Sequence, residues 1–205
     1  MDYLRPVEAI IPGVQGRVLG VLARTETELT MRTVAHLANV SATRAATVLN
    51  QLMRLGMVTR REAGSAALVS LVRDNEAAQA VLFLAGLRES ALEHIGALAH
   101  EIHPTPTSLV VFGSFALGRA EQESDIDVLV VRPAEMAADD DAWTDSLGTW
   151  QDAARRVVGN PLNLIEVGAE EMASLQSRPG SVWQDVARDG ILLVGMPVAE
   201  LSSVP

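Results

Sequence analysis

The feature that most constrains the fold of this 205-residue chain is a glycine–serine pair separated by ten residues from two aspartates. Gly113 and Ser114 directly follow an apolar stretch, 108–112, which is typical of a buried strand. Asp125 and Asp127 open the next apolar stretch, and both carboxylates should point the same way because strand residues two apart share a face. Glycine lets a phosphate approach the backbone, while the serine hydroxyl and helix amides supply donors. The pattern therefore predicts a phosphate-binding turn beside a divalent-cation site.

The two motifs at this spacing, in a strand–turn–helix–strand context, resemble the signature of the DNA polymerase beta-like nucleotidyltransferase superfamily, in particular its minimal nucleotidyltransferases. The resemblance covers roughly residues 104–195 and implies a small mixed-sheet α/β domain. It implies transfer of a nucleoside monophosphate from an NTP to a protein, RNA or small-molecule acceptor, with Mg²⁺ or Mn²⁺ as cofactor. The residues implied to bind nucleotide are Gly113, Ser114 and Ser124, and the implied catalytic metal ligands are Asp125 and Asp127.

That superfamily normally supplies a third aspartate from a later strand, and here an amide stands at this position. The predicted strand 161–167 carries Asn163 where the acid is expected. An amide can ligate a metal through its oxygen, but it neither accepts a proton nor adds negative charge. Glu166 has the opposite parity on that strand and faces elsewhere unless a bulge re-aims it. Three outcomes stay open: an active transferase that uses Glu166 or another group, a slow enzyme, and a nucleotide-sensing domain without catalysis.

The N-terminal residues show three amphipathic helical patterns followed by two strands. These elements are expected over 14–22, 31–38, 41–55, 57–61 and 66–72. Their order, together with the segments 29–41 and 49–58, resembles a winged helix-turn-helix domain. The resemblance implies binding to double-stranded DNA through exposed residues of the recognition helix and the wing. These residues are Ser41, Thr43, Arg44, Thr47, Arg60 and Arg61. The alternative is a dimerisation or docking module whose arginines are merely solvated.

Between the two regions, residues 75–103 are strongly helical and apolar over more than one face, with Gly86 dividing them into two helices. So wide an apolar arc must be covered by the second domain or by another subunit, and we predict a homodimer. The predicted fold class is α+β. It comprises a winged helix-turn-helix domain over 1–74, a helical connector over 75–103 and a nucleotidyltransferase-like domain over 104–205.

Charge is divided unevenly between these parts, although the whole chain carries a net −10. Residues 1–74 hold nine arginines and six acidic residues, a net +3, which leaves seven basic and twenty acidic residues, a net −13, for the remainder. The chain has no cysteine, its start lacks the pattern of a signal peptide, and its apolar runs are too short to span a bilayer. We therefore predict a cytoplasmic protein without membrane association.

Two functions of different classes follow from these patterns. The first is a DNA-binding protein whose nucleotidyltransferase domain is an active enzyme. The second is a transcription regulator whose catalytically weakened nucleotidyltransferase-like domain senses a nucleotide or binds a partner. The combination suggests a prokaryotic regulator of toxin–antitoxin type, by analogy with the fold alone.

Overall fold

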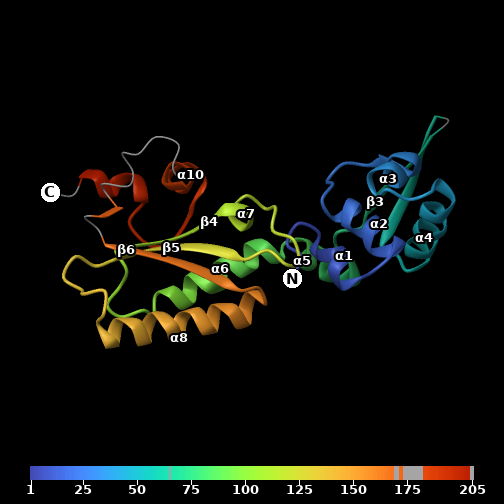
Figure 1. Cartoon of the computed structure of the whole chain (residues 1–205). Helices are drawn as coiled ribbons and strands as arrows, with labels where there is room; N and C mark the ends of the chain where they lie inside the picture. The colour runs from blue at the N-terminus through green and yellow to red at the C-terminus, as the bar shows by residue number, and fades with distance from the viewer. Residues whose placement is uncertain (65, 169–170, 173–181, 204–205) are drawn as a thin grey trace. The chain divides into compact units, whose positions relative to one another are not determined.

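The chain folds into two compact units in the computed structural model (Figure 1). The residues that the structure describes are 1–64, 66–168, 171–172 and 182–203. Residues 5–87 form the N-terminal unit, and residues 88–205 form the C-terminal unit together with residues 1–4. The N-terminal unit is therefore an insertion in the sequence of the C-terminal unit, a feature that the predicted division into three consecutive parts does not contain.

The N-terminal unit combines helices with a small antiparallel sheet of order β1-β3-β2. Its elements are α1 (Pro6–Ile10), α2 (Val14–Ala23), β1 (Leu29–Thr30), α3 (Met31–Leu37), α4 (Ala42–Arg54), β2 (Val58–Ala63), β3 (Ala66–Leu71) and α5 (Glu76–Ala85). The side chains of Thr30 and Ser41 cap α3 and α4 by accepting hydrogen bonds from the backbone N–H groups of Thr33 and Arg44. The three helices and the hairpin thus lie where the sequence predicts them.

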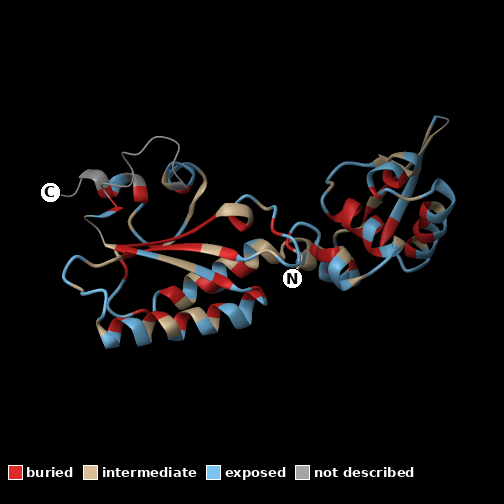
Figure 2. Ribbon diagram, in the orientation of Figure 1, coloured by how far each residue is buried: buried red, intermediate tan, exposed pale blue. Residues whose placement is uncertain are grey.

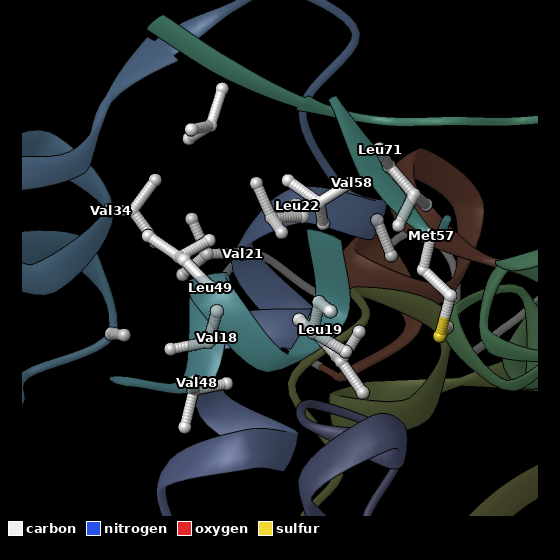
Figure 3. Packing of buried hydrophobic residues seen from close by; sticks show 14 of the residues in the cluster. Val18, Leu19, Val21, Leu22, Val34, Val48, Leu49, Met57, Val58 and Leu71 are labelled. Atoms are coloured by element: carbon white, nitrogen blue, oxygen red, sulfur yellow. The ribbon is translucent and has the colours of Figure 1, made fainter. Parts of the chain in front are cut away.

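The core of the N-terminal unit is aliphatic and is formed largely by α2, α3 and α4 (Figure 3). Val18 and Leu19 of α2, Val34 of α3 and Leu49 of α4 are all at most 1% exposed. Because α4 turns this apolar face inward, the polar residues at its start are held on the outside of the unit.

The predicted helical connector is divided between the two units. Gly86 separates α5 from α6 (Leu87–Ala99), as the sequence predicts. Ala78 and Val81 of α5 enter the core of the N-terminal unit, whereas α6 belongs to the C-terminal unit from Arg88 onward. Part of the wide apolar arc of this segment is therefore covered within the chain itself.

The C-terminal unit is built on a mixed sheet of order β6-β5-β4-β7. Its elements after α6 are β4 (Ser108–Phe112), α7 (Gly113–Ala116), β5 (Ile126–Arg132), α8 (Asp141–Val158), β6 (Leu162–Gly168), α10 (Val182–Asp189), β7 (Ile191–Gly195) and the 3-10 helix η1 (Val198–Ser203). Strands β5 and β6 are parallel, whereas β4 pairs antiparallel with both β5 and β7. A parallel pair needs a crossover connection, which α8 provides.

Helices cover both faces of this sheet, whose inner strands are almost wholly buried (Figures 1 and 2). On one face, α8 packs with α6, and the indole Nε1 of Trp150 donates a hydrogen bond to the carbonyl oxygen of Ile95 at 3.1 Å. On the other face, Val186 of α10 and Leu201 of η1 join a buried cluster with Val110 of β4. This is the mixed-sheet α/β arrangement that the sequence predicts for the region. In the described part of the chain, none of the helices has the length and apolar character needed to cross a bilayer.

Candidate functional site

The glycine–serine turn lies where the inner strand β4 passes into the short helix α7. Gly113 has a left-handed backbone with φ of +69°, which costs glycine little. A Cβ atom at this position would lie 2.6 Å from Oδ2 of Asp127. Ser114 occupies the first turn of α7 and is partly exposed. The turn therefore brings the backbone of Gly113 directly against the Asp127 carboxylate, a contact that leaves no room for a side chain.

Asp127 and Asn163 lie side by side on neighbouring strands. The two residues are direct partners in the parallel register of β5 and β6, and Nδ2 of Asn163 donates a hydrogen bond to Oδ1 of Asp127 at 3.0 Å. An amide donor stabilises the negative charge of a carboxylate without adding a second charge. The structure thus places Asn163 beside Asp127, where the resemblance implies a further carboxylate.

Asp125 and Ser124 lie in the turn before β5, which begins at Ile126. The expectation that both aspartates lie on the strand is therefore corrected for Asp125, which is exposed, whereas Asp127 is partly buried. The cause is a local turn in which the N–H of Ser124 donates to the carbonyl oxygen of Glu121 at 3.1 Å. The Ser124 hydroxyl oxygen accepts a hydrogen bond from the Glu121 N–H at 2.9 Å, so its own proton remains available for a ligand.

A buried asparagine that the sequence analysis missed fixes this turn. Asn160, between α8 and β6, is 1% exposed, and its Nδ2 donates to the carbonyl oxygen of Ser124 at 2.9 Å. The N–H of Ile126 donates to the carbonyl oxygen of Pro161 at 2.8 Å. Together these bonds hold the residues on either side of Asp125 against the start of β6. An asparagine before proline reads as an ordinary turn residue, so no local signal distinguishes Asn160 in the sequence.

Glu166, the other candidate for the third carboxylate, binds partners away from Asp127. Its Oε1 lies 2.6 Å from Nη1 of Arg132 and accepts a hydrogen bond from Nε1 of Trp143 at 3.0 Å. Trp143 belongs to α8, so Glu166 points to the face that α8 covers, opposite the one that carries Asn163 and Asp127. No register shift accompanies the β5–β6 pairing that could re-aim it within the described strand.

The donor atoms gathered around Asp127 suit a hard divalent cation. Carboxylate and amide oxygens are ligands that Mg²⁺ and Mn²⁺ prefer, whereas a zinc site would call for nitrogen or sulfur donors. Among the residues that the structure describes, no group of three or more His, Cys, Asp or Glu side chains comes together. A cation held by Asp125 and Asp127 would therefore take several of its ligands from phosphate oxygens and water.

The residues predicted to bind DNA lie on the surface of the N-terminal unit. The exposed polar residues at the start of α4 are Ser41, Thr43, Arg44 and Thr47. Two of them, Ser41 and Arg44, line a hollow of about 550 Å³ that Arg17 also borders. On β2, Arg60 and Arg61 are also exposed, but each contacts a carboxylate. Arg61 binds Glu28, and this hydrogen bond lowers the pKa of the Glu28 carboxyl below its usual value.

Comparison with known protein families identifies a match within the C-terminal unit. Residues 95–163 match the family model described as a nucleotidyltransferase domain, and this segment ends at Asn163. A solved structure of a toxin-antitoxin with AMP-PNP is 18% identical with a TM-score of 0.38 over 55% of this chain and 81% of the other. A toxin-antitoxin MntA-HpeT mutant is 15% identical with a TM-score of 0.37 over 55% of this chain and 80% of the other. No curated protein matches the chain. The resemblance of residues 1–74 to a winged helix-turn-helix domain stays a prediction.

Proposed function

We propose that the C-terminal unit is a nucleotidyltransferase that transfers a nucleoside monophosphate from an NTP to a protein, RNA or small-molecule acceptor. The observation that carries this proposal is the meeting of Gly113, Asp127 and Asn163 at one point. All three residues lie in the segment that matches the nucleotidyltransferase family model. In this proposal Gly113, Ser114 and Ser124 bind the triphosphate, and Asp125 and Asp127 bind Mg²⁺ or Mn²⁺.

The reaction joins the acceptor oxygen or nitrogen to the α-phosphorus while the bond from that phosphorus to the bridging oxygen breaks and pyrophosphate leaves. A bound divalent cation would neutralise phosphate charge as it develops. The side chains divide the remaining tasks. Asn163 orients Asp127 through its amide, and the proton of the acceptor must pass to an aspartate or to water because the amide cannot accept it.

The alternative is a domain that binds the nucleotide and senses it without turnover. One specific observation favours it: the amide of Asn163 donates to the carboxylate of Asp127, so a group without basicity occupies the third position. Loss of a general base typically costs about 10²–10⁴ in rate, which would leave nucleotide binding intact but transfer slow.

A label-transfer experiment separates these two functions. The protein is incubated with each labelled NTP, Mg²⁺ and extract of the host cells, next to Asp125→Ala/Asp127→Ala and the exposed control Asp152→Asn on α8. Label transfer that only the double variant loses supports the enzyme. Triphosphate binding without transfer supports the sensor, and the absence of both overturns the proposal.

Restoring the missing acid gives the enzyme proposal a second test. Asn163→Asp adds a carboxylate directly opposite Asp127. We expect Mg²⁺-dependent transfer to rise by about tenfold or more if an acceptor is bound nearby and only the base is lacking. An unchanged rate in a variant that still binds nucleotide would show that this position does not limit turnover.

For the N-terminal unit we propose binding to double-stranded DNA through α4. The supporting observation is that four polar residues at the start of this helix are exposed, and that two of them, Ser41 and Arg44, line the hollow that Arg17 also borders. Arg60 and Arg61 would contact DNA phosphates only after their ion pairs with Glu62 and Glu28 break. Arg44 is therefore the arginine expected to contribute most.

This proposal is tested by the salt dependence of binding to fragments of the protein's own promoter region. Each phosphate contact contributes about −0.9 to the slope of log K against log salt. Arg44→Ala should reduce the magnitude of that slope by about 1. Arg54→Ala, an exposed arginine at the other end of α4, is the matched control and should leave the slope unchanged. Wild-type protein that shows no salt-dependent binding would overturn the proposal.

We propose in addition that the protein forms a homodimer in the cytoplasm. In the N-terminal unit, Ile10 of α1 is 55% exposed and Phe83 of α5 is 61% exposed, although α1 and α5 pack together. Exposed apolar side chains on adjoining helices are typical of interaction surfaces. Sedimentation equilibrium should give twice the chain mass for wild type and a single chain for Phe83→Glu. A monomeric wild type would contradict the dimer.

A further inference from the structure

Helix α7 begins at Gly113 and carries Ser114, yet it is too short to be stable by itself. It has four residues, a single turn, and isolated helices shorter than about 12 residues are marginal in water. Its N-cap residue Phe112 provides no capping hydrogen bond from its side chain. The position of the nucleotide turn must therefore be set by contacts from elsewhere in the chain.

The first such contact comes from Tyr3 near the start of the chain. Its ring meets the fully buried Phe115 of α7 edge to face, with ring centroids 4.8 Å apart. The N–H groups of Tyr3 and Leu4 both donate to the carbonyl oxygen of Ala120, at 3.0 and 2.9 Å. The Tyr3 hydroxyl donates to the carbonyl oxygen of Val158 at the end of α8 at 2.9 Å. Tyr3 thus joins α7, the loop after it and the end of α8.

The second contact comes from Arg88 at the start of α6. Its Nε donates to the carbonyl oxygen of Phe115 at 2.7 Å, and its Nη2 donates to the carbonyl oxygen of Ala116. These carbonyls end α7, where a helix leaves acceptors unsatisfied and favours a positive charge. The side chain of Arg88 is only 18% exposed, so this capping is shielded from water. Arg88 therefore fixes the end of α7 opposite to the nucleotide turn.

We propose that Tyr3 and Arg88 are positioning residues for the nucleotide turn. The inference rests on the proposed function, in which Gly113 and Ser114 bind the triphosphate. Tyr3 lies just before the inserted N-terminal unit, and Arg88 lies just after it. The chain therefore contacts α7 both where it leaves the C-terminal unit and where it re-enters that unit. Neither residue reaches the aspartates through any contact described above, so they act on nucleotide binding through α7.

The test compares full-length variants that remove or preserve each contact. Arg88→Ala and Tyr3→Ala remove them, whereas Arg88→Lys keeps the charge without the two-carbonyl geometry and Tyr3→Phe keeps the ring. Arg156→Ala, an exposed arginine on α8, is the control. Hydrogen exchange of the backbone amides of residues 113–119 reports on anchoring, and calorimetric titration with each ribonucleoside triphosphate and Mg²⁺ reports on binding.

We expect both alanine variants to speed exchange in residues 113–119 by about tenfold or more, with β5 and α8 still protected. Nucleotide affinity should fall by about tenfold in each variant, because the charge-assisted hydrogen bond of Arg88 and the edge-to-face ring contact of Tyr3 each have roughly that value. The KM for the NTP should rise while kcat at saturating NTP is kept, since Asp125 and Asp127 are intact. Tyr3→Phe should restore both properties nearly to wild type, and Arg88→Lys should restore them in part.

Two results would overturn the inference. Unchanged exchange in residues 113–119 would show that Tyr3 and Arg88 do not hold α7. Faster exchange with unchanged nucleotide affinity would show that they hold α7 without serving the nucleotide turn. If wild-type protein binds none of the triphosphates, the proposed function fails as a whole, and the exchange measurement still decides whether α7 is anchored as described.

Discussion

The two units present their polar side chains in opposite ways. In the C-terminal unit, polar groups from distant parts of the sequence converge on one place, as when Asn163 donates to Asp127 and Asn160 holds Ser124. In the N-terminal unit, the polar groups lie apart along α4 and β2 and face solvent. A converging site depends on every contact that aligns it, whereas a dispersed surface adds up small independent contributions.

The ion pairs of the two units show the same difference. Arg132 and Glu166 in the C-terminal unit have side chains only 16% and 29% exposed, and Trp143 gives the carboxylate a further donor. Arg61 and Glu28 in the N-terminal unit are 59% and 34% exposed. Water and salt weaken the second pair far more than the first. Substitutions that break such ion pairs should therefore lower stability strongly in the C-terminal unit and weakly in the N-terminal unit.

The largest effect on nucleotide binding is expected for Gly113→Ala. The added Cβ would lie 2.6 Å from Oδ2 of Asp127, so the carboxylate must rotate away from its present position. We expect Mg²⁺-dependent nucleotide affinity to fall by at least about tenfold, the equivalent of 1.4 kcal/mol, in a calorimetric titration.

Gly159→Ala provides the matched control. Gly159 also has a left-handed backbone, with φ of +73°, but a Cβ there meets nothing within 4 Å. Both variants should lose about 1 kcal/mol of stability from the backbone conformation, while only Gly113→Ala should lose nucleotide binding. Equal affinities of the two variants would show that the position of the Asp127 carboxylate does not matter for the ligand.

The next prediction concerns Glu166→Ala and the stability of the C-terminal unit. Glu166→Ala leaves the guanidinium of Arg132 shielded from water without its carboxylate and also removes the acceptor of the Trp143 indole. We expect the C-terminal unit to lose about 2 kcal/mol in urea denaturation followed by tryptophan fluorescence. Label transfer by the folded variant should stay at the wild-type rate, because Glu166 lies on the other face of the sheet. If the variant kept its stability but lost label transfer, Glu166 would have to take part in the transfer reaction.

Local patterns in the sequence were sufficient to predict most of the elements. The caps at Thr30 and Ser41, the break at Gly86 and the strand at 108–112 depend on neighbouring residues alone, and the structure has each of them. Glu166 also points away from Asn163, as its position on the strand predicts, because strand alternation is a local property. What these patterns have in common is that the deciding residues lie within a few positions of one another.

The residues that the sequence did not reveal act over long separations. Tyr3 contacts Phe115 and Val158, and Arg88 caps α7 from 27 residues away. Their local sequence gives no sign of these partners, because a tyrosine near a terminus and an arginine in a helix are ordinary surface residues. The insertion of residues 5–87 between the two parts of the C-terminal unit escaped prediction for the same reason. Asp125 precedes β5 by one residue because of the local turn from Glu121 to Ser124, to which the distant Asn160 donates a hydrogen bond.

A smaller effect concerns the pH dependence of Tyr3, which is the single tyrosine of the chain. Burial disfavours the phenolate and raises the pKa of Tyr3 above the ordinary value of 10.0. The contribution of Tyr3 to the free energy of unfolding is therefore complete below pH 10.0 and is lost as the pH rises through the raised pKa. Ultraviolet titration of tyrosinate absorbance reads this residue alone. An ordinary titration curve in the folded protein would show that Tyr3 is not held against Phe115.

The smallest effect is expected for Glu28→Gln in the N-terminal unit. The hydrogen bond from Arg61 lowers the pKa of Glu28, so its stabilising contribution is present above pH 4.5 and disappears as the pH falls through the lowered value. Because both side chains face water, raising the salt concentration should remove most of the difference between variant and wild type at neutral pH. Thermal denaturation at low and high salt measures this. A destabilisation as large as that of Glu166→Ala, insensitive to salt, would contradict the view that the N-terminal unit carries its charges as independent surface groups. Tighter DNA binding by Glu28→Gln would show in addition that the carboxylate competes with phosphate for Arg61, since a guanidinium without its carboxylate partner should bind a polyanion more tightly.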